Sequence, residues 1–119
     1  MSSSPILHVA EKSELSFTDG LYYPDAFSEN GFTHCCSPDQ LKGVLSRYYE
    51  EKTGLILLVI NPDEQRLQIR FEDTTGSGEK FPHIYAGIPQ NLILNRAELP
   101  DGEKEREAFL MNIQKRLNP

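Results

Sequence analysis

The sequence predicts an α+β fold, with mainly antiparallel sheets and helices on their flanks. Short apolar segments at residues 6–10, 55–60 and 92–94 are typical of strands, and turns rich in Gly, Pro and Asp separate them. Amphipathic stretches at 38–51 and 101–117 are typical of helices. No internal repeat or low-complexity tract interrupts this pattern, which favours sheets packed against helices around one core.

The size and charge of the chain limit its function. Its 119 residues have the length of one domain, residues 1–119, in which we expect a disordered N-terminus at 1–5, a core at 6–97 and a closing helix at 101–117. The formal net charge is −6, so the surface offers no basic field to hold a long polyanion. We therefore expect no extended nucleic acid as a partner, although a local pocket can still take a small anion.

We expect a cytoplasmic protein without a membrane partner. No stretch reaches the roughly 18 apolar residues of a membrane span, and residues 1–5 lack the basic and apolar regions of a signal peptide. The only cysteines, Cys35 and Cys36, are neighbours and poorly disposed to form a disulfide with each other. Free thiols are typical of a reducing compartment. The oligomeric state stays open.

The first predicted strand contains a histidine. Residues 6–10 are apolar apart from His8, and a lone histidine in such a strand is more often a hydrogen-bonded core residue than a ligand. An extended aromatic segment with Tyr22 and Tyr23 follows, and Phe27 comes shortly after. These rings can form the floor of a base-stacking pocket, but packing in the core is the interpretation we favour.

The best-marked junction in the sequence is a strand that runs into a helix. In the extended part, Phe32, His34 and Cys36 share one face, whereas Thr33 and Cys35 take the other. The Ser-Pro-Asp-Gln sequence that follows predicts a helix start, because serine is a good N-cap, proline suits the first helical position and the glutamine completes a capping box. We therefore expect the His34 imidazole to lie at the end of a strand, held by a rigid strand-to-helix junction.

The middle of the chain predicts one helix and two strands. Residues 38–51 form an amphipathic helix. Its apolar stripe consists of Leu41, Val44, Leu45 and Tyr48. The run at 55–60 is apolar throughout, which predicts a strand covered on both faces. A half-exposed strand follows, because apolar and polar residues alternate there. The apolar members of this strand are Leu67, Ile69 and Phe71.

The last third begins with a predicted mobile loop at 73–80, whose glycine spacing is not that of a phosphate-binding P-loop. The segment at 81–85 then places His83 close to Tyr85. A strand at 92–94 precedes the closing helix. The apolar face of that helix consists of Phe109, Leu110, Ile113 and Leu117.

The three histidines allow two hypotheses from residue chemistry alone. His8, His34 and His83 together with Cys36 offer a donor set that zinc accepts, but the sequence has no Cys-x-x-Cys or His-x-x-x-His pair, so we expect no metal. Alternatively, Cys36 is a nucleophile with His8 or His83 as its base, and its place just before a helix would lower the pKa of the thiol. A buried, inert thiol is the interpretation we favour.

The order of these motifs resembles one known family over about residues 6–97, the domain-of-unknown-function family numbered 952. The resemblance rests on His8 in a first apolar strand, Gly-Phe-Thr-His-Cys at 31–35 with Gln40, Phe71-Glu72-Asp73, and Phe-Pro-His-Ile-Tyr at 81–85. Thr33 replaces a usual aliphatic residue, Cys36 a usual serine and Phe71 a usual tryptophan. Cys36 therefore weakens any role that needs a hydroxyl at its position.

That family is similar in fold to the ADP-ribosyltransferases, which hold a nicotinamide dinucleotide in the cleft of a split, mainly antiparallel sheet arrangement. It most resembles the branch of the RNA 2′-phosphotransferases, which carry one histidine on the first strand and a second on a later strand, and lack the usual catalytic glutamate. The resemblance thus implies that His8 and His34 are catalytic and that NAD is a substrate. We add His83 and Tyr85 to the cofactor-binding set by our own inference.

The chemistry of such a site suits these residue types. Cleavage between ribose and nicotinamide passes through an oxocarbenium-like state, and hydrogen bonds to a sugar hydroxyl strengthen as its charge develops. Neutral imidazoles such as His8 and His34 make such bonds near pH 7. Phe32 or Tyr85 can stack on a planar ring. Glu72 and Asp73 are the carboxylates available to stabilise the cation or act as a base, although solvated carboxylates at a strand end are the more common case.

Three hypotheses follow. The chain is a transferase of ADP-ribose, a non-catalytic module that binds a nucleotide or ADP-ribose-type ligand, or a structural domain with core histidines. An RNA phosphate as substrate is disfavoured, because the acidic surface is wrong for RNA and the candidate cations are scattered. These cations are Arg47, Arg70, Lys80 and Arg96.

Overall fold

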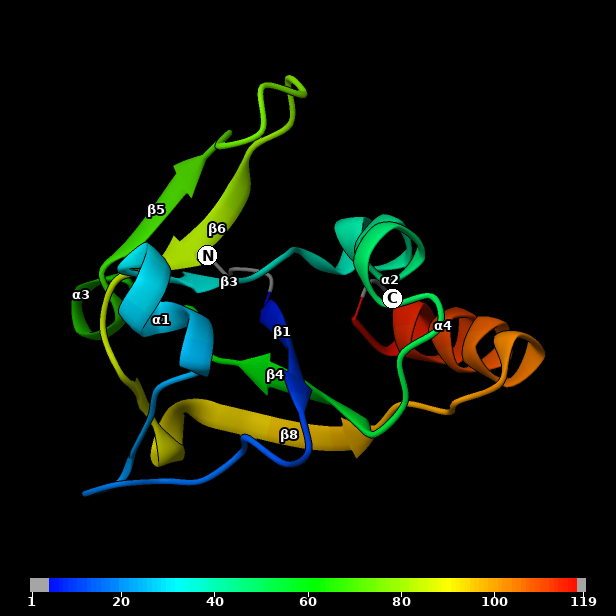
Figure 1. Cartoon of the computed structure of the whole chain (residues 1–119), viewed down its shortest axis with the longest axis horizontal. Coiled ribbons are helices and arrows are strands. Elements are labelled where there is room, and N and C mark those ends of the chain that lie inside the picture. Colours follow the sequence, from blue (N-terminus) through cyan, green and yellow to red (C-terminus); the bar gives the residue numbers. More distant parts are fainter. Residues whose placement is uncertain (1–4, 118–119) are drawn as a thin grey trace.

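The fold consists of antiparallel sheets and helices. The computed structural model describes residues 5–117, apart from the side chains of residues 114, 116 and 117. The central sheet has the spatial order β1 (Ile6–Glu11), β4 (Leu55–Ile60), β8 (Ile93–Glu98). The outer sheet has the order β3 (Thr33–His34), β6 (Phe81–Ile84), β5 (Ile69–Glu72). A third pair joins β2 (Leu21–Tyr22) to β7 (Ile88–Pro89). The predicted α+β class with antiparallel sheets is confirmed (Figure 1).

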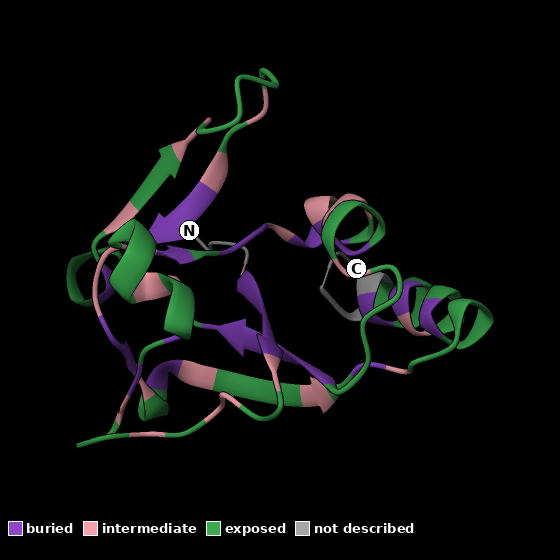
Figure 2. Cartoon of the chain, in the orientation of Figure 1, coloured by how far each residue is buried: buried purple, intermediate pink, exposed green. Residues whose placement is uncertain are grey.

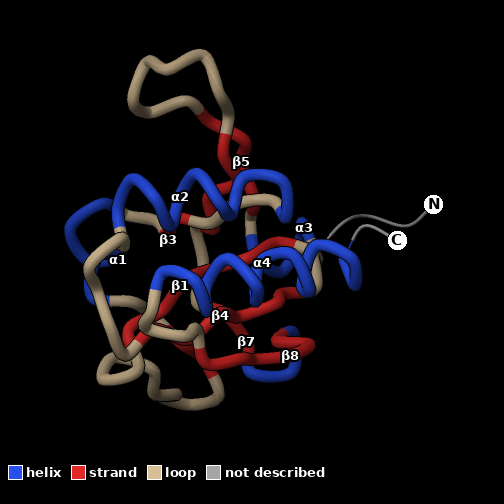
Figure 3. Tube along the Cα trace, turned by 90° about the vertical axis from the view of Figure 1, so that its right-hand side faces the viewer, coloured by secondary structure: helices blue, strands red, loops and turns tan. Residues whose placement is uncertain are grey.

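Two of the helices cover one face of the central sheet. The α-helices are α1 (Asp25–Asn30), α2 (Leu41–Tyr48), α3 (Glu64–Leu67) and α4 (Glu103–Leu117). Two single 3₁₀ turns, η1 (Pro38–Gln40) and η2 (Gln90–Leu92), precede α2 and β8. Figures 1 and 3 show α2 and α4 side by side, while the loop between β5 and β6 projects away from the body. Within residues 5–117, no helix has the length and apolar character needed to cross a membrane.

The predicted strand at 55–60 is β4, and all of its residues are buried, as Figure 2 shows in purple. Its side chains alternate between two separate apolar clusters. Leu55, Leu57 and Val59 pack with residues of α2 and α4. The other three residues pack in the cluster on the side of the outer sheet. The continuous apolar run therefore reflects cover on both faces, as expected.

The chain segment after β3 links the outer sheet to the central sheet. The backbone N–H groups of Leu7 and Cys36 each donate to the other residue's carbonyl oxygen at 2.8 Å. Cys35 packs in the cluster toward the outer sheet, and Cys36 packs in the cluster with α2 and α4. The predicted placement of the two cysteines on opposite faces is confirmed.

The predicted capping box at the strand-to-helix junction is also confirmed, because the Ser37 backbone N–H donates to Gln40 Oε1 at 2.9 Å. The helix starts as the 3₁₀ turn η1, and α2 ends at Tyr48 rather than near residue 51. Leu41 and Leu45 are buried, whereas Tyr48 is 55% exposed. The predicted apolar stripe is therefore wrong at Tyr48, because the helix ends there and the ring leaves the core.

The segment around Leu67 differs from the predicted alternating strand. Asp63 caps the short helix α3 by accepting the Arg66 backbone N–H at 3.2 Å, and Leu67 is the buried last residue of this helix. Gln68 then takes a left-handed conformation, with φ of 50°, so the chain direction changes before β5 begins. Within β5, Ile69 packs against the core while Phe71, two residues further on, is 56% exposed.

The last strand and helix lie close to their predicted positions. β8 starts at residue 93 and the closing helix at residue 103, each within two residues of the expected start. Leu110 and Ile113 are buried and Phe109 is partly buried, as expected for the apolar face. The side chain of Leu117, and residues 1–4 of the predicted disordered N-terminus, lie outside the described residues.

A buried arginine of α4 holds the loop that follows α2. Arg106 is 6% exposed. Its guanidinium donates to the carbonyl oxygens of Pro100 at 2.7 Å and Tyr49 at 2.6 Å, and also to that of Lys52. These acceptors lie after the end of α2 and before α4, outside the regular helices, and among them the Tyr49 oxygen also accepts from the Lys52 backbone N–H at 3.1 Å. Arg106 thus anchors residues 49–52 to the closing helix.

We predict that Arg106→Met lowers the free energy of unfolding by about 3 kcal/mol, because three carbonyl groups lose the charged donor of a buried side chain while the apolar stem is retained. Urea denaturation at pH 7 measures the loss. The control Met111→Ala changes an exposed residue of the same helix and should stay within about 0.5 kcal/mol of the parent. Equal stability of the two variants would contradict the anchoring role.

Candidate functional site

Side chains from three strands gather on one face of the outer sheet. The register pairs His34 of β3 with His83 of β6, and His83 with Arg70 of β5. Alternate residues along an extended segment share a face. Phe32 therefore lies on the same side as His34, Glu72 on the same side as Arg70, and Tyr85 on the same side as His83. We call this set the aromatic–imidazole face. Its members are Phe32, His34, Arg70, Glu72, His83 and Tyr85.

The rings of this face are in mutual contact. Phe32 stacks on His83 with ring centroids 4.3 Å apart and planes at 24°. It also contacts His34 at 4.7 Å and Tyr85 at 5.2 Å between centroids. The guanidinium of Arg70 lies over the Tyr85 ring, 4.7 Å from its centroid. The face is therefore a packed aromatic surface in which each ring limits the freedom of its neighbours.

Glu72 provides the carboxylate of this face. Its Oε1 accepts from the Tyr85 hydroxyl at 2.5 Å and from His83 Nδ1–H at 3.0 Å. The hydrogen bond from Tyr85, and then that from His83, lowers the pKa of Glu72 below its ordinary value. The same bond raises the pKa of Tyr85. At neutral pH, Glu72 is thus ionised and orients both the imidazole and the phenol.

His34 is the exposed imidazole of the face. The side-chain amide of Asn30 donates to its Nε2 at 3.3 Å, and the rings of His34 and His83 meet edge-on with centroids 5.2 Å apart. Desolvation, followed by the nearby His83, lowers the pKa of His34. The ring is therefore neutral at physiological pH.

His8 lies apart from the aromatic–imidazole face, on β1 of the central sheet. Its Nδ1–H donates to the backbone oxygen of His34 at 2.8 Å, and its Nε2 accepts from the Tyr22 hydroxyl at 3.2 Å. The side chain is 7% exposed, and burial lowers its pKa to about 4. Both ring nitrogens are thus occupied by partners from the chain itself, which are the bonds of a core histidine.

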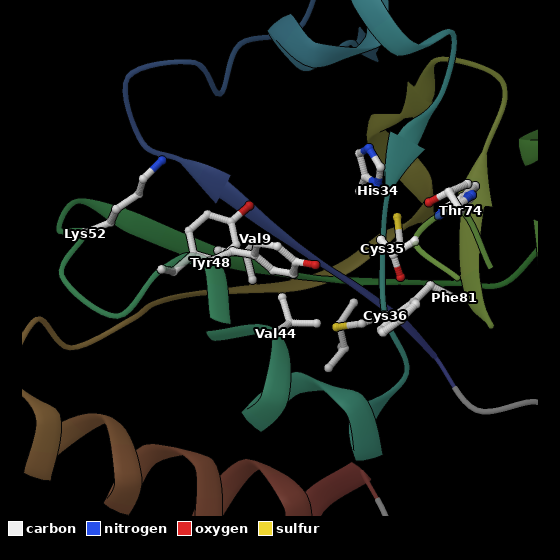
Figure 4. Close-up of a pocket in the computed structure, with 13 residues that line it drawn as sticks. Val9, His34, Cys35, Cys36, Val44, Tyr48, Lys52, Thr74 and Phe81 are labelled. Atoms are coloured by element: carbon white, nitrogen blue, oxygen red, sulfur yellow. The ribbon is translucent and has the colours of Figure 1, made fainter. Parts of the chain in front are cut away.

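A hollow of about 480 Å³ begins at this face and extends toward α2 (Figure 4). We call it the main hollow. In Figure 4, His34 lies at its rim, and Lys52 and Thr74 stand at opposite ends. Aromatic and imidazole rings supply much of its wall. These rings belong to His34, Tyr48, Tyr49, Phe81 and His83. Lys52 is the only lysine or arginine among the described residues that line it.

A second hollow of about 380 Å³ lies on the other side of His34. His8 and His34 both line it, so the two histidines predicted to be catalytic reach a common concavity. Four carboxylate residues and Lys52 also line this acidic hollow. The carboxylate residues are Glu11, Glu14, Asp25 and Glu29. Its charge opposes the binding of phosphate groups.

The cysteines do not have the properties of nucleophiles. Burial raises the pKa of Cys36 to about 12 and that of Cys35 well above its ordinary value. The expected lowering by the following helix is therefore wrong for Cys36, because desolvation exceeds any effect of a short helical turn. Across residues 5–117, no three histidine, cysteine or carboxylate side chains are arranged to hold a metal ion.

Several residues of the main hollow were not predicted from the sequence. Tyr49 and Lys52 follow α2, and Thr74 and Thr75 belong to the loop between β5 and β6. Asp73 orders this loop, since its carboxylate accepts from the Ser77 and Gly78 backbone N–H groups at 3.1 and 2.7 Å. The position of this polar loop directly after Glu72 was the only feature of the sequence that could have indicated that Thr74 and Thr75 lie near the site.

The pKa of His8 predicts how stability depends on pH. Because the folded-state pKa is about 4 and the ordinary value is 6.5, the unfolded chain binds the extra proton between these values. The contribution of neutral His8 is complete above pH 6.5 and is lost as pH falls toward 4, by about 3 kcal/mol in total.

We predict that His8→Gln lowers the free energy of unfolding at pH 7 by about 2 kcal/mol, because the bonds to His34 and Tyr22 are disturbed. The difference between parent and variant should shrink as pH falls from 6.5 and change sign before pH 4, since the parent loses about 3 kcal/mol through this titration and the variant does not. Urea denaturation across that range measures it. A difference that stays constant with pH would show that His8 does not remain neutral in the folded state.

Comparison with known proteins identifies the family. The crystal structure of protein CC0527 from Caulobacter crescentus is similar to this chain with a TM-score of 0.76 and 18% sequence identity, covering 91% of this chain and 99% of that one. The solution NMR structure of CC0527 gives a TM-score of 0.69 and 20% identity, with 85% and 89% covered. No curated protein matches the chain. The family described as "Protein of unknown function (DUF952)" matches residues 8–96, and the chain therefore belongs to the DUF952 family.

Proposed function

We propose that the chain binds a small ligand with a planar heteroaromatic ring, such as the nicotinamide or the base of a nucleotide, in the main hollow. The observation that carries this proposal is the convergence of the aromatic–imidazole face with a concavity large enough for such a group. The rings of Tyr48, Tyr49 and Phe81 offer apolar surface in the main hollow, and the imidazoles of His34 and His83 offer hydrogen bonds. NAD is the first ligand to test, because of the resemblance to the ADP-ribosyltransferases.

The charges around the site indicate which part of a nucleotide contributes most to binding affinity. Lys52 is the only full cation among the described residues that line either hollow. Arg70 is engaged with the Tyr85 ring. Strong phosphate sites combine several charged or backbone donors, so a pyrophosphate gains little here. We therefore expect the ring to dominate affinity, and nicotinamide to retain much of the binding of NAD.

A titration with NAD, nicotinamide and ADP-ribose, followed through the histidine ring signals by NMR, tests this proposal. We predict that the His34 signals shift with NAD and with nicotinamide, and that His34→Ala weakens both ligands about tenfold by removing a hydrogen-bonding ring. The control Leu94→Ala alters an exposed residue of β8, which belongs to the other sheet, and should leave affinity unchanged. Unshifted histidine signals at millimolar ligand would reject the proposal.

Transfer of ADP-ribose is the second candidate function, within an ADP-ribosyltransferase-like fold. The observation in its favour is an ionised carboxylate, Glu72, in the same cluster as His34. A carboxylate can stabilise the cation that develops on ribose as nicotinamide leaves. His34 would then bind a ribose hydroxyl, and His8 would hold the His34 backbone in place through its 2.8 Å bond.

Release of nicotinamide from NAD, measured by chromatography, separates transfer from binding. If transfer occurs, we expect His34→Ala to reduce the release rate at least about a hundredfold, as for a group that stabilises a transition state. The Leu94→Ala control should retain the parent rate. Binding of NAD without nicotinamide release above the buffer rate would reject transfer and leave the binding function.

A further inference from the structure

Two imidazoles of the aromatic–imidazole face lie side by side, and their other contacts determine where each carries its hydrogen. In His83, Nδ1 lies 3.0 Å from Glu72 Oε1. An ionised carboxylate only accepts hydrogen bonds, so Nδ1 carries the hydrogen in the form of the ring that holds a single one. Nε2 of His83 is then a lone-pair acceptor. No partner for it is found among the residues that the structure describes.

His34 has the same tautomer for a different reason. The amide nitrogen of Asn30 is a donor only, and it lies 3.3 Å from Nε2 of His34. Nε2 must therefore accept, and Nδ1 of this neutral ring carries the hydrogen. No described residue accepts a hydrogen bond from this Nδ1–H.

The pair thus offers one donor and one acceptor on two neighbouring rings. The two ring centroids are 5.2 Å apart, and both residues line the main hollow. Phe32 packs against both rings and limits their rotation. Since His83 is 2% exposed, leaving its acceptor nitrogen unpaired beneath a ligand would be unfavourable.

We propose that His34 and His83 together bind a primary carboxamide, with His34 Nδ1–H donating to the amide oxygen and His83 Nε2 accepting an amide N–H. This inference rests on the proposed function, since it concerns the ring substituent of a ligand in the main hollow. A carboxylate in the same place has no hydrogen to offer His83, and its negative charge meets a lone pair. A ketone also lacks an N–H to donate to His83, but it is uncharged and so avoids the repulsion between a carboxylate and the lone pair. In carboxamide binding Glu72 is a positioning residue, because it bonds to the His83 ring and does not line the main hollow.

The tautomers can be measured without any ligand. Long-range proton–nitrogen NMR of the imidazoles at pH 7 should show the Nδ1–H form for both His34 and His83. Glu72→Gln removes the charge that holds His83, so this variant should change the nitrogen shifts of His83 more than those of His34. An Nε2–H form of either ring in the parent protein would overturn the inference.

The ligand test uses three pyridines that differ only in the substituent. Nicotinamide should bind at least about tenfold tighter than 3-acetylpyridine, which keeps the carbonyl but lacks the N–H, and tighter still than nicotinate. The preference for nicotinamide over 3-acetylpyridine should fall toward unity in His83→Phe and persist in Leu94→Ala. Thermal denaturation establishes that each variant is folded.

The outcomes separate this inference from the proposed function. Equal binding of the three pyridines, with His34 signals shifting for each, would overturn the carboxamide assignment and leave a heteroaromatic site. Absence of binding by all three would reject both. If His83→Phe fails to fold, the comparison of the three pyridines on the parent protein and the measured tautomers still decide the question.

Discussion

The backbone of residues 34–36 joins the two larger sheets, and the arrangement of the site depends on this connection. His34 pairs with His83 in the outer sheet, while two residues later Cys36 exchanges backbone hydrogen bonds with Leu7 of the central sheet. The His34 carbonyl oxygen, directed away from this pairing, accepts the Nδ1–H of His8. One short segment thus places the His34 ring at the border of both hollows. Any shift between the sheets would move that ring.

This connection explains how the histidines differ in role. His8 is buried and uses both nitrogens inside the protein, so its contribution is to hold the His34 backbone. His83 is equally buried but is bonded on one side only, by Glu72. His34 is exposed and neutral. The same residue type therefore differs in burial and bonding from strand to strand, and these differences underlie the roles proposed for His34 and His83.

Electrostatics make the site polar without a strong positive charge. The carboxylate of Glu72 is balanced by hydrogen bonds from His83 and Tyr85 rather than by a salt bridge to an arginine. Four acidic residues line the second hollow, and Lys52 is the only lysine or arginine among the described residues that line the main hollow. Such a site favours neutral, planar, hydrogen-bonding groups over phosphates, because affinity for the latter requires several donors at once.

The sequence by itself determined the features that depend on local chemistry. The apolar run of β4, the capping box at Ser37 and the alternation of residues 32–36 were all predictable, because side-chain periodicity and backbone capping act over a few residues. The tertiary structure alone decided which groups meet. The bond between Glu72 and His83, the three carbonyl acceptors of Arg106 and the exposure of Phe71 after the turn at Gln68 all depend on strand order and register. Register is set by the packing of the whole core, so no local pattern specifies which distant residue will lie opposite.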